Sequence, residues 1–233
     1  RSQLATLKNP EMILRIAREE NKLEDVERIC IFKSTETFDQ LRKNKLVKED
    51  ALLFINSIAS VSLNDEDRER FHRYFSHIQS QIVVEVTEEE NMSEEALIRK
   101  RETKGFSGMF ALDDYGSGYN TEINLLNLSP KYIKIDLTIV RNIDKDFDKQ
   151  QLVSNIVEYA HQREGYIIAE GIETKEELLK VLELGVDYLQ GYYLSYPQLN
   201  PQEVSNESIK TITNSRCLWL FVLSHLYLWT WYV

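Results

Sequence analysis

The chain has 233 residues, 42% of them hydrophobic, so it can bury one substantial core, as a barrel-sized domain or as two small domains. Its 38 acidic residues against 28 basic ones give a net charge of −10, which argues against sequence-independent binding of DNA or RNA, because such binding neutralises phosphates with lysine and arginine. An acidic enzyme that acts on a phosphorylated substrate would need metal ions to offset the repulsion.

The opening residues predict two helices. Asn9-Pro10 is a helix-start signal, with Asn as the N-cap and Pro at the first helical position. A second helix is predicted from Leu23 to Lys43, and helical spacing gives it an apolar inner face. The residues of that predicted face are Val26, Ile29, Cys30, Phe32 and Phe38.

From Ala51 onward, short apolar runs alternate with amphipathic or polar segments. The runs are Ala51–Ile55, Ile82–Val86, Met109–Leu112, Tyr132–Ile135, Tyr166–Ala169 and Tyr188–Leu189. The segments between them are Asp65–Ser80, Glu89–Glu102, Asn120–Leu128, Lys145–Arg163 and Lys175–Leu184. Strand and helix in strict alternation predict a parallel sheet with crossover helices, in the doubly wound or the barrel form.

Polar side chains gather at the carboxyl end of every predicted strand. They are Asn56, Glu85 with Thr87 and Glu88, Asp113 with Asp114, Lys134 with Asp136, Glu170 with Glu173, and Gln190. In an α/β barrel that end is the catalytic face. Each residue alone also has a structural explanation as a cap, a surface lysine or a charged helix start, but their shared location favours a functional site.

The run Gly108–Tyr119 contains two adjacent carboxylates, Asp113 and Asp114, followed by Gly116-Ser117-Gly118. Neighbouring carboxylates repel each other, and burying both is costly unless a cation lies between them. The pair is therefore a candidate site for a divalent metal ion, and a pair of solvated turn aspartates is the alternative.

Six motifs follow one another along the chain. They are Phe54-Ile55-Asn56-Ser57, Val84-Glu85-Val86-Thr87-Glu88, Leu112-Asp113-Asp114-Tyr115-Gly116-Ser117-Gly118-Tyr119, Ile133-Lys134-Ile135-Asp136, Ala169-Glu170-Gly171-Ile172-Glu173 and Gln190-Gly191-Tyr192. In this order they resemble the ligand-asparagine strand and the E-x-T-E, D-D-F-G-x-G-Y, K-x-D, A-E-G-V-E and Q-G-Y motifs of the EAL family of cyclic di-GMP phosphodiesterases. Tyr115 replaces the family's Phe, and the resemblance covers roughly Arg1 to Pro197.

The resemblance implies an α/β fold of the TIM-type (β/α)8 class, of which about six of the eight strands are present. The family is named for a Glu-Ala-Leu at the end of an early strand, whose glutamate is a metal ligand. Arg1-Ser2-Gln3 resembles the residues directly after that motif, so the glutamate is expected just upstream of Arg1. Glu95-Ala96-Leu97 lies inside a predicted helix and is interpreted as a coincidence.

For the intact family, the resemblance implies hydrolysis of one phosphodiester bond of cyclic di-GMP to the linear dinucleotide pGpG, with two Mg²⁺ or Mn²⁺ ions. Asn56, Glu85 and Asp113 would hold the first ion together with the upstream glutamate, and Asp113 and Asp114 would hold the second. Glu170 is the candidate general base, and Lys134 would position the attacking water or stabilise the developing charge.

The remaining motif residues have supporting roles by the same resemblance. Asp136 would orient Lys134, Glu173 would anchor the glycine-bearing loop after Asp114, and Gln190 would contact substrate or water. The implied partners are cyclic di-GMP, a second copy of the chain in a homodimer, and an upstream sensory or GGDEF domain in the parent protein.

Because one of four ligands of the first ion is expected outside the sequence, the 233-residue chain is expected to be inactive or nearly so, and its parent active. One alternative is a degenerate EAL domain that binds cyclic di-GMP without cleaving it, although every matched acidic position from Glu85 onward is intact. The other alternative is an unrelated metal-using barrel, which the six ordered motifs disfavour.

The end of the chain differs from the rest. The predicted domain covers residues 1–213, including a last helix from Asn200-Pro201 to about Thr213, and residues 214–233 are predicted to be an apolar tail outside it. From Cys217 to Val233 the tail has no Asp, Glu, Lys or Arg, and it holds all three tryptophans. A membrane anchor for the parent protein, a partner-binding segment and an out-of-frame artefact are the alternatives. The two cysteines, Cys30 and Cys217, lie far apart in the sequence with no metal-ligand spacing, so reduced thiols and a cytoplasmic location are expected.

Overall fold

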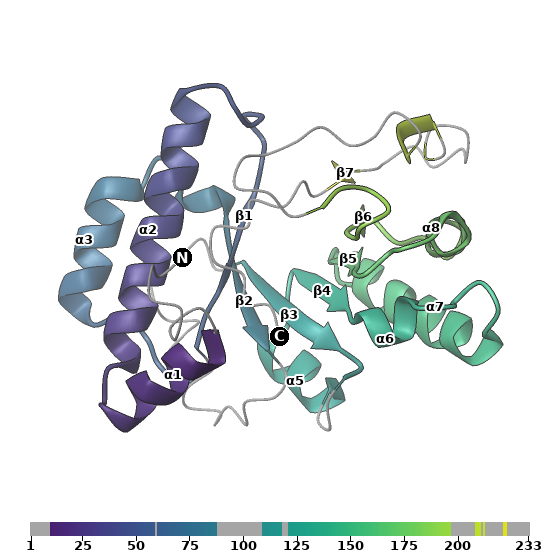
Figure 1. Cartoon of the computed structure of the whole chain (residues 1–233), viewed down its shortest axis with the longest axis horizontal. Coiled ribbons are helices and arrows are strands. Elements are labelled where there is room, and N and C mark those ends of the chain that lie inside the picture. Colours follow the sequence, from purple (N-terminus) through teal and green to yellow (C-terminus); the bar gives the residue numbers. More distant parts are fainter. Residues whose placement is uncertain are drawn as a thin grey trace. The chain divides into compact units, whose positions relative to one another are not determined.

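The computed structural model describes residues 10–58, 60–87, 109–117, 121–196, 208–210, 212 and 221–222. These residues form helices and parallel strands in two compact units (Figure 1). The first unit includes Arg1–Val86, and the second includes Phe110–Tyr227. The predicted segment Glu89–Glu102, with Glu95-Ala96-Leu97, lies outside the described residues.

The first unit contains three helices and two strands among its described residues. In chain order these elements are α1 Pro10–Glu19, α2 Leu23–Lys43, β1 Leu53–Asn56, α3 Asp65–Phe75, the 3₁₀ turn η2 Gln79–Gln81 and β2 Ile82–Thr87. Both predicted N-terminal helices are confirmed. The N-cap of α3 is Asn64, whose side chain accepts a hydrogen bond from the Asp67 amide. Strands β1 and β2 pair in parallel, from Leu53 opposite Ile82 to Asn56 opposite Glu85.

The predicted inner face of α2 is partly wrong. Phe38 is fully buried as expected, but Ile29 is 57% exposed. The buried stripe follows a different phase of the helix and includes polar side chains. Its members are Glu27, Ile31, Ser34, Thr35, Phe38, Asp39 and Leu41. A prediction from the helical period chooses only apolar residues for the buried face of a helix. The burial of a carboxylate such as Glu27 depends on hydrogen-bond partners from distant segments, which the period does not show.

The second unit is built from five parallel strands and their connecting helices in its described part. Its elements are β3 Phe110–Tyr115, α5 Thr121–Leu128, β4 Tyr132–Ile135, α6 Leu137–Val140, α7 Phe147–His161, β5 Tyr166–Ala169, α8 Lys175–Glu183, β6 Tyr188–Leu189 and β7 Phe221–Val222. Strands β3 to β7 pair in sequence order. The bounds predicted for β4, β5 and β6 are confirmed, whereas α6 and β7 were not predicted.

Apolar side chains fill the interior of the second unit around its central strands. Ile133, Ile135, Ile167 and Ile168 are almost completely buried, and α7 packs against β4 and β5. Parallel strands covered on both faces have near-continuous apolar runs, which is why β4 and β5 could be recognised from the sequence. The strands therefore form a rigid frame whose carboxyl ends carry the polar motif residues.

The start of α8 is fixed by a capping box. The Thr174 hydroxyl accepts a hydrogen bond from the Glu177 amide, and the Glu177 carboxylate accepts from the amide of Thr174. Burial alone would raise the pKa of Glu177, but hydrogen bonds from the amides of Asn142, Glu173 and Thr174 hold it below its usual range. This carboxylate thus ties the segment after α6 to the loop that carries Glu173.

The tail is described at Phe221 and Val222, which pair in parallel with Tyr188 and Leu189 of β6. Residues 208–210 and 212 are helical, within the predicted last helix. The other tail residues lie outside the described part of the chain, and the boundary at residue 214 stays a prediction. Among the described helices, none is long and apolar enough to cross a membrane.

Candidate metal and catalytic site

The end of β3 departs from regular strand geometry at the two aspartates. Asp114 has a φ of 56°, and the pairing of β3 with β4 shifts register between Leu112 and Tyr115. Neighbouring side chains of a regular strand point to opposite faces, whereas a bulge redirects one of them. A non-glycine residue in this region of φ costs about 1–3 kcal/mol, a strain often found at functional sites. The prediction had placed both aspartates after the strand, and the structure places them inside it.

The turn after β3 depends on a glycine. Gly116 has a φ of +99°, and a Cβ atom there would lie 2.1 Å from Cδ1 of Ile139. The next residue, Ser117, donates hydrogen bonds to the Asp114 carbonyl from its amide, at 3.0 Å, and from its hydroxyl, at 2.9 Å. The turn therefore fixes the backbone of Asp114 directly at the end of the strand. Residues 118–120 lie outside the described residues.

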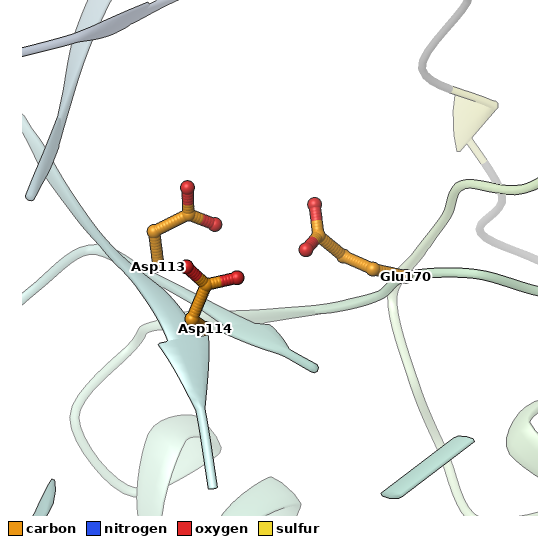
Figure 2. A group of neighbouring side chains, drawn as sticks. All are labelled: Asp113, Asp114 and Glu170. Carbon is orange, nitrogen blue, oxygen red and sulfur yellow. The ribbon is translucent and has the colours of Figure 1, made fainter. Parts of the chain in front are cut away.

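Three carboxylates meet at this end of the second unit. One oxygen from each of Asp113, Asp114 and Glu170 lies within 4.8 Å of the others. Figure 2 shows Asp113 and Asp114 extending from β3, while Glu170 approaches from the segment after β5. Three like charges at this spacing raise one another's energy unless cations offset them.

Lys134 supplies one such cation. Its Nζ lies 2.7 Å from Asp113 Oδ1 and 2.8 Å from Glu170 Oε1, and its side chain is only 8% exposed. Lys134 belongs to β4 and lies opposite Ile168 of β5, so the sheet register holds it between the two carboxylates. One ammonium among three carboxylates keeps the group acidic, and an acidic, oxygen-rich group suits a divalent cation.

In the first unit, the register of β1 and β2 places Asn56 beside Glu85 at the carboxyl ends of the strands. The amide of Ser57 donates to the Glu85 carbonyl at 3.0 Å, and Glu85 is 2% exposed. The side-chain oxygen of Asn56 is buried and has no hydrogen-bond partner within the described part of the chain. Since a buried acceptor without a donor is costly, this oxygen fits a role as a metal ligand.

The donor chemistry of both groups is uniform. All the candidate ligand atoms are carboxylate or amide oxygens, from Asn56, Glu85, Asp113 and Asp114. Oxygen donors suit hard cations such as Mg²⁺ and Mn²⁺, whereas zinc sites are rich in cysteine and histidine. The residues present therefore fit the metal ions that the sequence motifs imply.

The other predicted site residues occupy the loops around this cluster. Asp136 is the N-cap of α6, and its carboxylate accepts from the Thr138 amide at 2.8 Å. Glu173 lies 3.1 Å from the guanidinium of Arg141. Gln190 is half-buried, and its backbone N–H donates a hydrogen bond to the Ala169 carbonyl at 2.8 Å. The roles predicted for these three residues in orienting Lys134, anchoring the loop after Asp114 and contacting substrate stay predictions.

Two residues with evident roles were missed at the level of the sequence. Arg141 pairs with Glu173 and follows α6, an element that no pattern predicted. Glu27 is buried on α2 and bonds to the segment directly after Asn56. A carboxylate at helical spacing from Ile31 and Phe38 was the available signal for Glu27, because an acidic residue within an apolar stripe requires a partner.

The model of the EAL domain family matches residues 1–197, and these residues include every candidate site residue of both units. The chain belongs to the EAL domain family. It is 33% identical over 120 residues to the cyclic di-GMP phosphodiesterase PdeF of Escherichia coli K12, a match that covers 51% of this chain and 16% of PdeF. The chain covers 16 to 25% of the length of three such curated relatives.

Solved EAL structures share the fold. The complex of Klebsiella pneumoniae BlrP1 with manganese and cyclic di-GMP matches with a TM-score of 0.65 and 26% identity, over 75% of this chain and 45% of that chain. An EAL domain protein of Listeria monocytogenes EGD-e matches with a TM-score of 0.67 and 22% identity, over 88% of this chain and 79% of that chain. The predicted fold class, α/β with the parallel strands of an EAL TIM barrel, is confirmed.

Proposed function

We propose that this EAL domain is a metal-dependent phosphodiesterase domain that hydrolyses cyclic di-GMP to the linear dinucleotide pGpG. The observation that supports this most is the group of Asp113, Asp114 and Glu170 around the buried Lys134, in a chain homologous to cyclic di-GMP phosphodiesterases. An oxygen-rich acidic cluster with one fixed ammonium suits phosphoryl chemistry that depends on divalent cations.

The proposed ligands divide between two Mg²⁺ or Mn²⁺ ions. Asn56, Glu85 and Asp113 would hold the first, and Asp113 and Asp114 would hold the second. Family membership supports this assignment, as do the buried, unpartnered oxygen of Asn56 and the strained backbone of Asp114. When bound, such ions lower the pKa of water and neutralise charge on the phosphate.

Glu170 is proposed as the general base. Its carboxylate would accept the proton of the attacking water at one oxygen, while Oε1 stays fixed by Lys134 at 2.8 Å. The ammonium of Lys134 is held from two sides, so it cannot rotate away as charge develops on the phosphate. A preorganised cation of this kind stabilises a transition state without reorganisation.

Four further residues support the proposed chemistry. The Asp136 carboxylate fixes the start of α6 directly after the strand that carries Lys134. Gly191, which follows Gln190, has backbone too close to Ile172 to admit a Cβ atom, so the loop after β6 is held against the loop that carries Glu170 and Glu173. Gln190 in this loop is proposed to contact substrate or water, and Glu173 to hold the turn after Asp114.

Calorimetry followed by a turnover assay tests the proposal on the 233-residue chain. We expect cyclic di-GMP to bind in the presence of Ca²⁺, and Mg²⁺ to support formation of pGpG. EDTA should abolish both. Binding with Ca²⁺ but no product with Mg²⁺ or Mn²⁺, even from a longer natural chain, would instead favour a receptor. Absence of any cyclic di-GMP binding would contradict the proposal.

A further inference from the structure

Glu27 is a buried carboxylate that lies far in sequence from every motif of the family. It belongs to α2, is 3% exposed and reaches the segment that follows β1. Oε2 accepts a hydrogen bond from the Ile58 amide at 2.9 Å, and Oε1 accepts a short one from the Ser57 hydroxyl. The two carboxylate oxygens thus bind two consecutive residues, Oε1 binding Ser57 and Oε2 binding Ile58.

Packing alone does not explain a carboxylate at this position. The neighbouring buried residues of the stripe include Ile31, Phe38 and Leu41, and burying a charge is costly even when hydrogen bonds compensate it. The charge also acts on its surroundings. Together with burial, which is the larger cause, it raises the pKa of the Cys30 thiol to about 11. An apolar side chain would pack at lower cost but would leave the Ile58 amide without this acceptor.

The two residues that Glu27 binds directly follow Asn56. On one side of Asn56, β1 is fixed by its pairing with β2, in which Asn56 lies opposite Glu85. On the other side, Ser57 donates its amide to the Glu85 carbonyl and its hydroxyl to Glu27. The backbone around Asn56 is therefore held from both directions. The buried side-chain oxygen of Asn56 has no hydrogen-bond partner in the described part of the chain.

We propose that Glu27 is a positioning residue for the metal site. It would hold the segment after β1 so that the side-chain oxygen of Asn56 stays available to a metal ion. This inference rests on the proposed function, because it takes Asn56 as a metal ligand. Residues that orient a ligand typically change metal affinity about 10–100-fold when they are replaced.

Glu27→Met in the full 233-residue chain tests the inference. Free Mn²⁺ is measured by electron paramagnetic resonance during a titration, and unfolding is measured in urea. We expect Glu27→Met to weaken Mn²⁺ binding by about 10-fold or more. Glu27→Gln should restore most of the affinity, since its carbonyl can still accept from the Ile58 amide.

Phe38→Leu is the matched control, because it removes buried volume from the same helix, about three turns from Glu27, and leaves the hydrogen bonds of Glu27 to Ser57 and Ile58 in place. It should lower stability while leaving Mn²⁺ affinity unchanged. Ser57→Ala provides a second, milder variant that removes only one of the two hydrogen bonds, and it should also weaken Mn²⁺ binding.

The outcomes separate this inference from the proposed function. Equal Mn²⁺ affinity in Glu27→Met, Ser57→Ala and Phe38→Leu would overturn the role of Glu27, while the metal site itself would stand. If Glu27→Met does not fold, unchanged affinity in Ser57→Ala overturns it as well. Absence of Mn²⁺ binding in the unchanged chain would overturn the proposed function and this inference together.

Discussion

Asp113→Asn is expected to weaken Mn²⁺ binding by about 100-fold or more, since replacing residues that merely support a ligand already costs up to about this factor. Asp113 is the proposed ligand shared by both ions, and the substitution removes its charge. It also places an amide in contact with the Lys134 ammonium, which now lies 2.7 Å from Oδ1. If the amide nitrogen faces Lys134 two donors oppose each other, and if the amide oxygen does, only one weak acceptor remains.

Isothermal titration of the full chain with Mn²⁺ measures this loss. Asp148→Asn is the matched control, because Asp148 is an exposed aspartate in the first turn of α7, outside the carboxylate group. Both variants lower the net negative charge equally, so a general charge effect would appear in both. If Asp113→Asn and Asp148→Asn bind Mn²⁺ equally well, Asp113 is not a metal ligand.

Lys134→Met is expected to destabilise the metal-free chain by about 3 kcal/mol or more, because removing one partner of a buried ion pair leaves an uncompensated charge. Here two carboxylates, Asp113 and Glu170, lose the cation that lies within 2.8 Å of both. Asp114 is close to them, so the repulsion within the group increases. Mn²⁺ should therefore stabilise the variant more than it stabilises the unchanged chain.

Urea unfolding with and without Mn²⁺ checks both parts of this expectation. Lys145→Met is the control, since the Lys145 side chain is 76% exposed and its Nζ lies 3.8 Å from a carboxylate oxygen of Asp144. Exposed pairs of this kind contribute about 0–1 kcal/mol. A Lys134→Met variant as stable as Lys145→Met, or one that gains no additional stability from Mn²⁺, would show that Lys134 does not neutralise a metal-binding cluster.

Much of the second unit could be predicted from the sequence because its strands are short apolar runs between polar segments. The bounds of β4, β5 and β6 follow directly from this pattern, and the pairing of Lys134 with Asp113 and Glu170 fits the prediction that strand ends share one face. In a parallel sheet the ends of neighbouring strands meet, so polar residues there converge whatever the intervening helices contain.

The bulge in β3 could not be predicted. Strand alternation predicts opposite directions for the adjacent residues Asp113 and Asp114, and the register shift that brings an oxygen of each close to Glu170 arises from the pairing with β4. The sequence contained an indirect sign of it. Two adjacent aspartates of one strand can bind the same metal site only if the regular alternation of side chains is interrupted there. Gly116 provides the turn that follows.

The face of α2 was mispredicted for a different physical reason. Ile29 is apolar at the expected helical spacing but remains exposed. Glu27 is buried, and its carboxylate accepts hydrogen bonds from Ser57 and Ile58, which are thirty residues or more away in the sequence. A single sequence shows the local period but does not show which distant segment supplies donors. The same limit applies to α6. Its N-cap is Asp136, and an aspartate at this position could equally have started a turn.

The most direct measurement for the central claim is anomalous diffraction from crystals of this chain saturated with Mn²⁺. The account predicts manganese density at Asp113, with Asn56 and Glu85 among the ligands of one ion and Asp114 among the ligands of another. Manganese found only at other carboxylates, or no manganese beside Asp113 at saturating concentration, would contradict it.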